Sequence, residues 1–136
     1  MSASVVSQAA AQPQALPRRD LFLFLELFEH EGGIQTYNRI LLESYRQIVG
    51  DRGDSDVIVL RDRPQTVRAE TSPSLRFHGL LRSRPAVLGR LDLAWRLVVR
   101  LLLYRPQRVF CGHVNLARLV HGLCGLLKIP YTVLAY

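Results

Sequence analysis

Apolar residues occur in short, nearly continuous runs along the 136-residue chain, and turn-forming residues separate these runs. Runs of this kind are typical of strands that are covered on both faces of a sheet. They predict strands over residues 20–28, 57–62, 107–114 and 129–136, and the segment 75–79 is a further candidate.

The segments between these runs have the character of helices. In residues 34–49, apolar residues recur at intervals of three and four, which is the spacing of one helical face. The expected apolar face consists of Ile34, Tyr37, Leu41, Tyr45 and Ile48. Residues 115–128 predict a helix with Asn115 as its N-cap, and the polar segment 63–74 is expected to be a loop.

Residues 86–103 form the longest helix candidate. A single polar stripe of Gly89, Asp92, Arg96 and Arg100 runs along an otherwise apolar cylinder. A membrane span would place these charged residues within about 20 residues of hydrocarbon, which is costly. We therefore expect a helix that packs on a sheet and keeps one edge in water.

The alternation of buried strands with helices predicts an α/β fold, a Rossmann-like parallel sheet with helices on both faces. Residues 20–136 are expected to form one domain, since no linker divides them. Residues 1–19 lack the basic start of a signal peptide, and Gln and Pro interrupt their apolar residues. We expect this segment to be a flexible leader.

Charge is unevenly distributed along the chain, whose net charge is +7. Residues 61–108 contain eleven Arg against three acids, whereas residues 1–60 carry a net charge of −3. Such a basic block indicates an anionic partner, and an anionic membrane surface or nucleic acid would both fit. The alternative is a solvated Arg-rich surface. Nucleic acid is the least favoured partner, because no recognition motif accompanies the charge.

Cys111 and Cys124 are the only cysteines, and they form no CxxC pair. The four histidines have no metal-ligand spacing, so we expect neither a disulfide framework nor a metal site. A reducing cytoplasm is then the default compartment.

Two adjacent glycines, Gly32 and Gly33, lie where the first strand passes into the first helix. Open parallel sheets bind ligands in such loops, outside the carboxyl ends of their strands. Glycine lets the backbone approach a ligand, and the N–H groups of Gly33, Ile34 and Gln35 would face an anion such as a phosphate. The alternative is a tight turn without a ligand. The stretch has neither the GxGxxG nor the Walker pattern.

The stretches "LFEHEGGIQTYNRILLESY" and "RVFCGHVNLARLVHGLCGLLKIPYTVLAY" resemble the amino-terminal domain of retaining, GT-B-fold glycosyltransferases, the large group 1 or family 4. The resemblance covers residues 20–136. It implies transfer of a hexose from a nucleotide sugar to a polysaccharide or lipid-linked acceptor. It further implies two Rossmann-like domains that face each other across a cleft. We expect no metal or other cofactor besides the nucleotide-sugar substrate. We also expect a cytoplasmic location, with peripheral contact at the inner face of the membrane through the basic block.

The same resemblance implies roles for individual residues. Gly32, Gly33, Ile34 and Gln35 would form the loop against the donor diphosphate. His113, Tyr136 and Glu31 would line the cleft on the side of the acceptor and the sugar. Tyr136 stands where many relatives have a histidine, and no catalytic residue is assigned.

The carboxyl-terminal half of the resembled enzymes has no counterpart in the chain, which stops at Tyr136. We therefore expect a fragment, incomplete at its carboxyl end, that is inactive alone and needs the missing donor-binding domain. The alternative function is a noncatalytic Rossmann-like module that docks on an anionic membrane surface or a partner protein.

Overall fold

A five-stranded, all-parallel sheet forms the centre of the molecule, in the order β3-β2-β1-β4-β5. The computed structural model describes residues 17–79 and 86–134. The strands are β1 (Asp20–Phe24), β2 (Ser55–Val59), β3 (Leu75–Gly79), β4 (Arg108–Cys111) and β5 (Tyr131–Val133). The helices are α1 (Gly33–Val49), α2 (Pro64–Arg68), α3 (Ala86–Tyr104) and α4 (Val114–Leu127), and a short 3₁₀ helix spans Gly50–Arg52.

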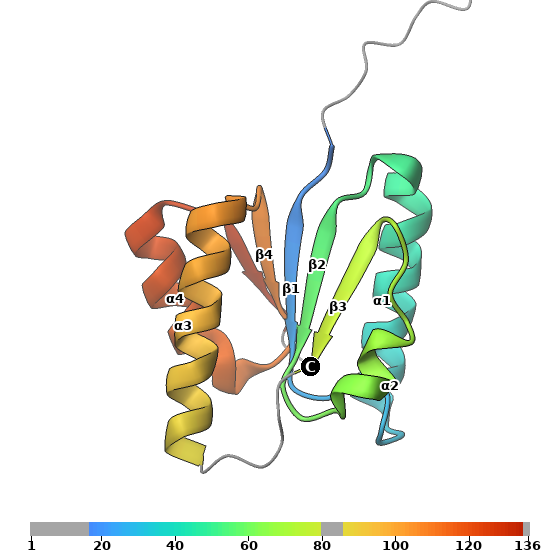
Figure 1. Cartoon of the computed structure of the whole chain (residues 1–136), viewed down its shortest axis with the longest axis horizontal. Helices are drawn as coiled ribbons and strands as arrows, with labels where there is room; N and C mark the ends of the chain where they lie inside the picture. Colours follow the sequence, from blue (N-terminus) through green and yellow to red (C-terminus); the bar gives the residue numbers. More distant parts are fainter. Residues whose placement is uncertain (1–16, 80–85, 135–136) are drawn as a thin grey trace, which may run out of the picture.

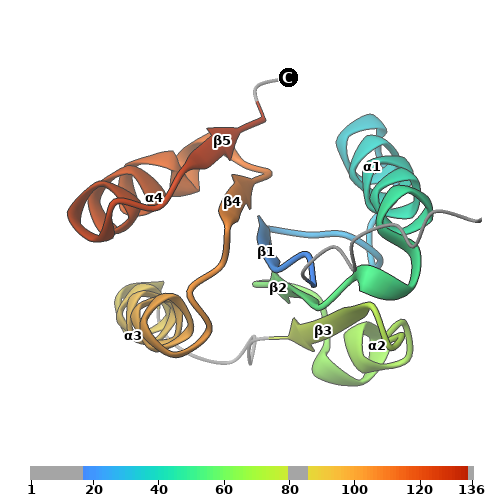
Figure 2. The ribbon, with the colours of Figure 1, turned by 90° about the horizontal axis from the view of Figure 1, so that it is seen from above.

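The helices cover both faces of the sheet. Helices α1 and α2 lie on one face, and α3 and α4 lie side by side on the other (Figures 1 and 2). This three-layer arrangement is the α/β, Rossmann-like architecture that the alternation of strands and helices predicts, and that prediction is confirmed.

Each strand divides its side chains between the two layers, because successive residues point to opposite faces. Leu21 and Leu23 of β1 join the core beneath α3 and α4, whereas Phe22 and Phe24 join the core beneath α1 and α2. Beneath α1 and α2 the ring of Phe22 stacks on the ring of Phe110, with 4.8 Å between the ring centroids. Both faces of the central strands are therefore buried, as their continuous apolar runs indicate.

Strand β1 ends at Phe24, four residues earlier than its apolar run suggests. The reason lies in the buried carboxylate of Asp62, which accepts the backbone N–H groups of Leu27 and Phe28. These amides are thereby taken out of the sheet ladder, and the chain turns toward α1. Strands β4 and β5 are likewise shorter than expected. His113 and Val114, at the end of the first predicted run, form the cap and first residue of α4, and β5 comprises Tyr131–Val133.

Two further local predictions are wrong. The segment 63–74 is not wholly a loop: Pro64 starts the short helix α2, which suits a residue whose missing N–H costs nothing in a first turn. The N-cap of α4 is His113 rather than Asn115, and the ring nitrogen Nδ1 of His113 accepts the N–H of Asn115.

Helix α1 is rotated relative to the expected apolar face. Its buried residues are Asn38, Leu42 and Val49. Leu41 and Tyr45 pack at the edge of the core, whereas Ile34, Tyr37 and Ile48 are exposed. The Tyr45 hydroxyl group donates a hydrogen bond to Asp20 and shares a second one with the hydroxyl group of Ser55, and these bonds hold the helix in this rotation.

The expected leader lies mostly outside the described residues, which begin at residue 17. Within it, Arg18 pairs with Gly53 through an isolated parallel β-bridge, and its N–H donates to the carbonyl group of Arg52.

Candidate functional site

The order of the strands places a topological switch point between β1 and β4. From β1 the chain builds outward through β2 and β3, and it then returns to add β4 and β5 on the other side of β1. Open α/β sheets bind their ligands at the carboxyl ends of the two strands that flank such a point. Here the flanking loops are residues 25–32, after β1, and residues 112–113, after β4.

Helix α1 begins at this edge without a side-chain cap. Its N-cap residue is Gly32, whose backbone is extended, and no side chain bonds to the cap. The first intrahelical bond runs from the N–H of Thr36 to the carbonyl group of Gly32. The preceding N–H groups, those of Gly33, Ile34 and Gln35, therefore have no acceptor within the helix.

The two glycines differ in what surrounds them. A Cβ atom on Gly32 would lie 2.5 Å from Oε1 of Gln35, so the side chain of Gln35 folds back over the start of the helix. A Cβ atom on Gly33 would meet no atom within 4 Å. Packing within the chain therefore does not require glycine at position 33, and open space lies beside its backbone.

Asp62 positions the loop that leads into α1. Its Oδ2 atom lies 2.9 Å from the amide nitrogen of Leu27 and 2.7 Å from that of Phe28. The N–H of Arg63 also donates to Oε1 of Glu29, at 2.9 Å. The loop after β2 thus holds the loop after β1. Asp62 was not among the residues expected at this site, although an acid at the end of an apolar run is a visible signal in the sequence.

Ion pairs balance part of the negative charge near the glycines. Glu26 lies 3.4 Å from Arg61 and 3.7 Å from the ring of His30. Glu29 lies 3.5 Å from Nε of Arg63. Glu31, expected on the acceptor side, is an exposed residue next to Gly32. The pairs reduce the repulsion that an anion would meet at this edge.

The residues after β4 have a structural role. A Cβ atom on Gly112 would overlap the ring of Phe24, so glycine lets the chain turn closely over β1. His113 caps α4 through Nδ1, at 3.1 Å from the amide nitrogen of Asn115, which leaves its Nε2 atom for other partners. Gly32, Gly33 and His113 therefore share the carboxyl edge of the sheet. Tyr136 lies outside the described residues.

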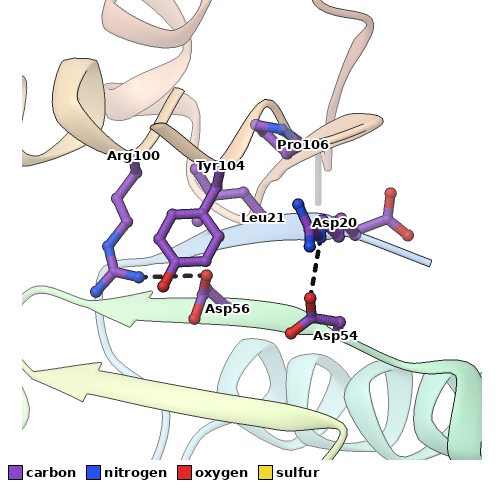
Figure 3. Close-up of a pocket in the computed structure, with 8 residues that line it drawn as sticks. Asp20, Leu21, Asp54, Asp56, Arg100, Tyr104 and Pro106 are labelled. Atoms are coloured by element: carbon purple, nitrogen blue, oxygen red, sulfur yellow. Dashed lines mark hydrogen bonds and ion pairs between the residues drawn. The ribbon is translucent and has the colours of Figure 1, made fainter. Parts of the chain in front are cut away.

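A second polar cluster lies at the opposite edge, where the strands begin (Figure 3). The buried carboxylate of Asp56 lies 3.0 Å from Nε of Arg76, 3.0 Å from Nε2 of His78 and 3.3 Å from Arg100. Burial alone would raise the pKa of Asp56, but hydrogen bonds from His78 and Arg76 and the charge of Arg100 outweigh it and lower that pKa.

The ring of Tyr104 covers this cluster, and the guanidinium carbons of Arg76 and Arg100 lie 5.6 and 5.1 Å from its centroid. A cavity of about 10 Å³ lies beside Asp56, Arg100 and Tyr104, and Arg19, Asp20, Leu21, Asp54 and Pro106 complete its lining (Figure 3). That volume holds one water molecule at most. The cluster is therefore an internal ion-pair network that joins β2, β3 and α3, and it offers no room for a ligand.

Metal-binding groups are not apparent. Among residues 17–79 and 86–134, no group of three or more His, Cys, Asp or Glu side chains could hold a metal ion. Cys111 and Cys124 are both free and buried.

Comparisons with known proteins support the fold. No family model matches the chain, and no curated protein matches it. A solved structure, the C-terminal domain of a hydrogenase from Pyrococcus furiosus, matches with a TM-score of 0.53 and 18% identity, over 90% of this chain and 95% of that domain. At this identity the likeness shows the fold alone, which is a Rossmann-like α/β domain. The neighbour itself is part of an enzyme.

The glycosyltransferase interpretation is wrong on these comparisons. The matching structure is a hydrogenase domain, and nothing found supports hexose transfer or polysaccharide biosynthesis. The physical reason is that the residues behind the resemblance belong to the fold. Gly112 and His113 make a close turn and a helix cap, and Gly32 and Gly33 stand at the loop-to-helix junction of a strand–loop–helix unit common to many such sheets.

Proposed function

We propose that the chain is the ligand-binding Rossmann-like domain of an enzyme and that it holds a phosphate-bearing small molecule, of the nucleotide class, at the start of α1. One observation carries the proposal. At the switch point between β1 and β4, α1 begins at Gly32 and Gly33 with no side-chain cap and with open space beside Gly33.

Phosphate suits this place for two reasons. The N–H groups of Gly33, Ile34 and Gln35 can donate hydrogen bonds, and the helix dipole of the 17-residue α1 adds a partial positive charge at the same end. Because Gly33 has no side chain, a phosphate oxygen can approach the backbone closely. Asp62 supports the site indirectly, since it holds the loop that aims the helix start.

The enzymatic part of the proposal is supported by the structural neighbour, which is a domain of an enzyme. Hydrogenase activity is not carried over, because the likeness extends to the fold and supplies no residue roles. The expected contribution of this domain is to bind and orient a phosphorylated substrate or nucleotide.

Amide chemical shifts test the proposal directly. The ¹⁵N-labelled protein is titrated with pyrophosphate and, separately, with ADP. We expect the largest shifts at Gly33, Ile34 and Gln35, and smaller shifts along the loop held by Asp62. Shifts confined to α3 and the arginines that follow it, or no shifts at saturating ligand, would contradict the proposal.

A pair of glycine variants provides the matched control. Gly33→Leu adds a side chain at an exposed position where a Cβ atom would meet no described atom within 4 Å, so the fold should persist while ligand binding falls at least tenfold. Gly122→Leu makes the same change at an open, exposed position of α4, away from the proposed site, and should leave binding unchanged. Equal affinities for the two variants would refute the role of the α1 amides.

A further inference from the structure

Helix α3 carries an apolar stripe on its outer side. Leu91, Trp95 and Leu102 are exposed by 62%, 68% and 55%. Their spacing of four and seven residues places them on one side of the helix. The core-facing side is formed by Leu93, Leu97 and Leu101, which are almost fully buried. The helix is thus apolar on the side away from the sheet as well as on the side toward it.

The stripe lies on the outer surface of the molecule. Helices α3 and α4 together cover one face of the sheet, and nothing in the described part of the chain lies beyond α3 on that side (Figure 2). From Leu91 to Leu102 the stripe is about 16 Å long, at 1.5 Å per residue. A surface of this length with an exposed tryptophan is unusual for a helix that faces only water.

Positive charge accompanies the stripe. Residues 86–136, which form α3, α4 and the last two strands, contain seven basic residues and one acid. That acid is Asp92, which pairs with Arg96 at 3.2 Å, and Arg100 pairs with Asp56 of β2 at 3.3 Å. Residues 17–79 contain nine basic and ten acidic residues. Arg105, directly after α3, and Arg118 of α4 are exposed. The excess charge therefore belongs to the half of the chain that builds the α3–α4 face.

We propose that this face docks on the surface of an anionic membrane, with Leu91, Trp95 and Leu102 inserted among the lipids. A helix with Trp and Leu on one side and arginines beside it lies in the plane of the membrane interface, where apolar burial and attraction to anionic headgroups add. None of the helices in the described residues is long and apolar enough to cross a bilayer. The docking is independent of the ligand site at α1.

Trp95 is the single tryptophan of the chain and reports on the docking directly. The full chain is mixed with two kinds of vesicle. One contains phosphatidylcholine alone, and in the other about one lipid in three is the anionic phosphatidylglycerol. We expect a blue shift of Trp95 emission with the anionic vesicles only, quenching by brominated acyl chains, and release at high salt. A blue shift that ignores lipid charge, or no quenching, would overturn the proposal.

Variants on the α3–α4 face, compared with a control variant on the α1 face, complete the test. Leu102→Ser should lower the partition coefficient about tenfold, and Arg105→Glu with Arg118→Glu should lower it further. Ile48→Ser is the control, because Ile48 is 78% exposed on α1, on the opposite face. An equal loss in the control would overturn the proposal. So would a blue shift that rises with protein concentration without vesicles, since a second copy would then cover the stripe.

Discussion

The hydroxyl group of Tyr45 on α1 donates a hydrogen bond to the buried carboxylate of Asp20 on β1, with 2.6 Å between the two oxygen atoms. Ser55 lies 2.7 Å from the same hydroxyl group, and Arg18 pairs with the same carboxylate oxygen at 2.9 Å. This contact joins the carboxyl-terminal half of the helix to the first residue of the first strand. It also sets which side of α1 meets the sheet.

Removal of this hydroxyl group should destabilise the fold. Tyr45→Phe keeps the ring packed against Phe22 but leaves the buried carboxylate with one donor fewer. We expect the free energy of unfolding to fall by about 2 kcal/mol, as for other hydrogen bonds to a charged group. Urea unfolding followed by circular dichroism measures the change. A loss below about 0.5 kcal/mol would show that water replaces the hydroxyl group without cost.

The pH dependence provides a second readout for the same residue. Burial and the hydrogen bond to Asp20 raise the pKa of Tyr45 above its ordinary value. The unfolded chain therefore loses this proton first, and the stabilisation is present below about pH 10 and lost as the pH rises above it. Tyr45→Phe should show a flatter decline of stability in that alkaline range than the wild-type chain.

Asp56 should make the largest single electrostatic contribution to the fold. Asp56→Asn leaves Arg76, His78 and Arg100 without their shared carboxylate, and we expect a loss of roughly 3 kcal/mol at neutral pH. Because the pKa of Asp56 is lowered in the folded state, its stabilisation is present above the unfolded pKa and is lost as the pH falls through the folded value. The free energy of unfolding of Asp56→Asn should therefore fall less at acidic pH than that of the wild-type chain.

An exposed ion pair serves as the control for Asp56. Glu43 pairs with Arg46 on the surface of α1, where solvent screens both charges. Glu43→Gln should leave the urea midpoint nearly unchanged. A similar loss for the two variants would mean that the buried network contributes no more than a surface pair does.

The fold class was predictable because it depends on many residues at once. The continuous apolar runs of β1, β2 and β4 and the helical segments between them persist even if single residues are misassigned. Their alternation is enough to predict a parallel sheet with helices on both faces. The position of Gly32 and Gly33 at the start of α1 followed from the same pattern.

The remaining details depend on contacts between residues far apart in the sequence. The end of β1 is decided by Asp62, which lies 35 residues from Leu27, and the rotation of α1 is decided by Tyr45 with Asp20. The N-cap of α4 is His113, although N-cap preferences favour Asn115, two residues later; the contact of the His113 ring with the amide of Asn115 decides the position. The activity was the least predictable, because residues that serve the fold also produced the resemblance to glycosyltransferases.

Two glycines in the second half of the chain should respond to alanine in opposite directions. Gly122 lies inside α4 with no atom within 4 Å of an added Cβ, so Gly122→Ala should stabilise the protein by about 1 kcal/mol. An added Cβ on Gly112 would overlap the ring of Phe24, so Gly112→Ala should cost about 1–3 kcal/mol. Thermal unfolding of both variants checks the pair, and changes of the same sign would contradict it.

Asp62 should control the order of the loop before α1. Asp62→Ala removes the acceptor of the Leu27 and Phe28 amides, and we expect a loss of about 3 kcal/mol together with faster hydrogen exchange at those two amides. Asp62→Asn keeps one oxygen acceptor and should retain part of the protection. If exchange at Leu27 and Phe28 is unchanged in the alanine variant, the carboxylate does not hold this loop.

Both thiols should resist modification in the folded protein. Cys111 and Cys124 are fully buried, and burial, together with the charge of Cys111, raises the pKa of Cys124 to about 11. Burial also raises the pKa of Cys111, although a backbone hydrogen bond from His113 opposes the shift. At pH 8 the reactive thiolate is therefore scarce and covered, and we expect reaction with a disulfide reagent only through unfolding.

A new cysteine on the surface supplies the comparison for the buried pair. Ser44 is exposed on α1, so Ser44→Cys should react rapidly while Cys111 and Cys124 remain protected, and all three should react together in urea. The pKa of each buried thiol is higher in the folded protein than in the unfolded chain. The stabilisation from the two protonated thiols is therefore present below about pH 9 and is lost as the pH rises above it. Rapid labelling of the native wild-type chain would show that the core beneath α4 opens far more readily than its packing against β4 implies.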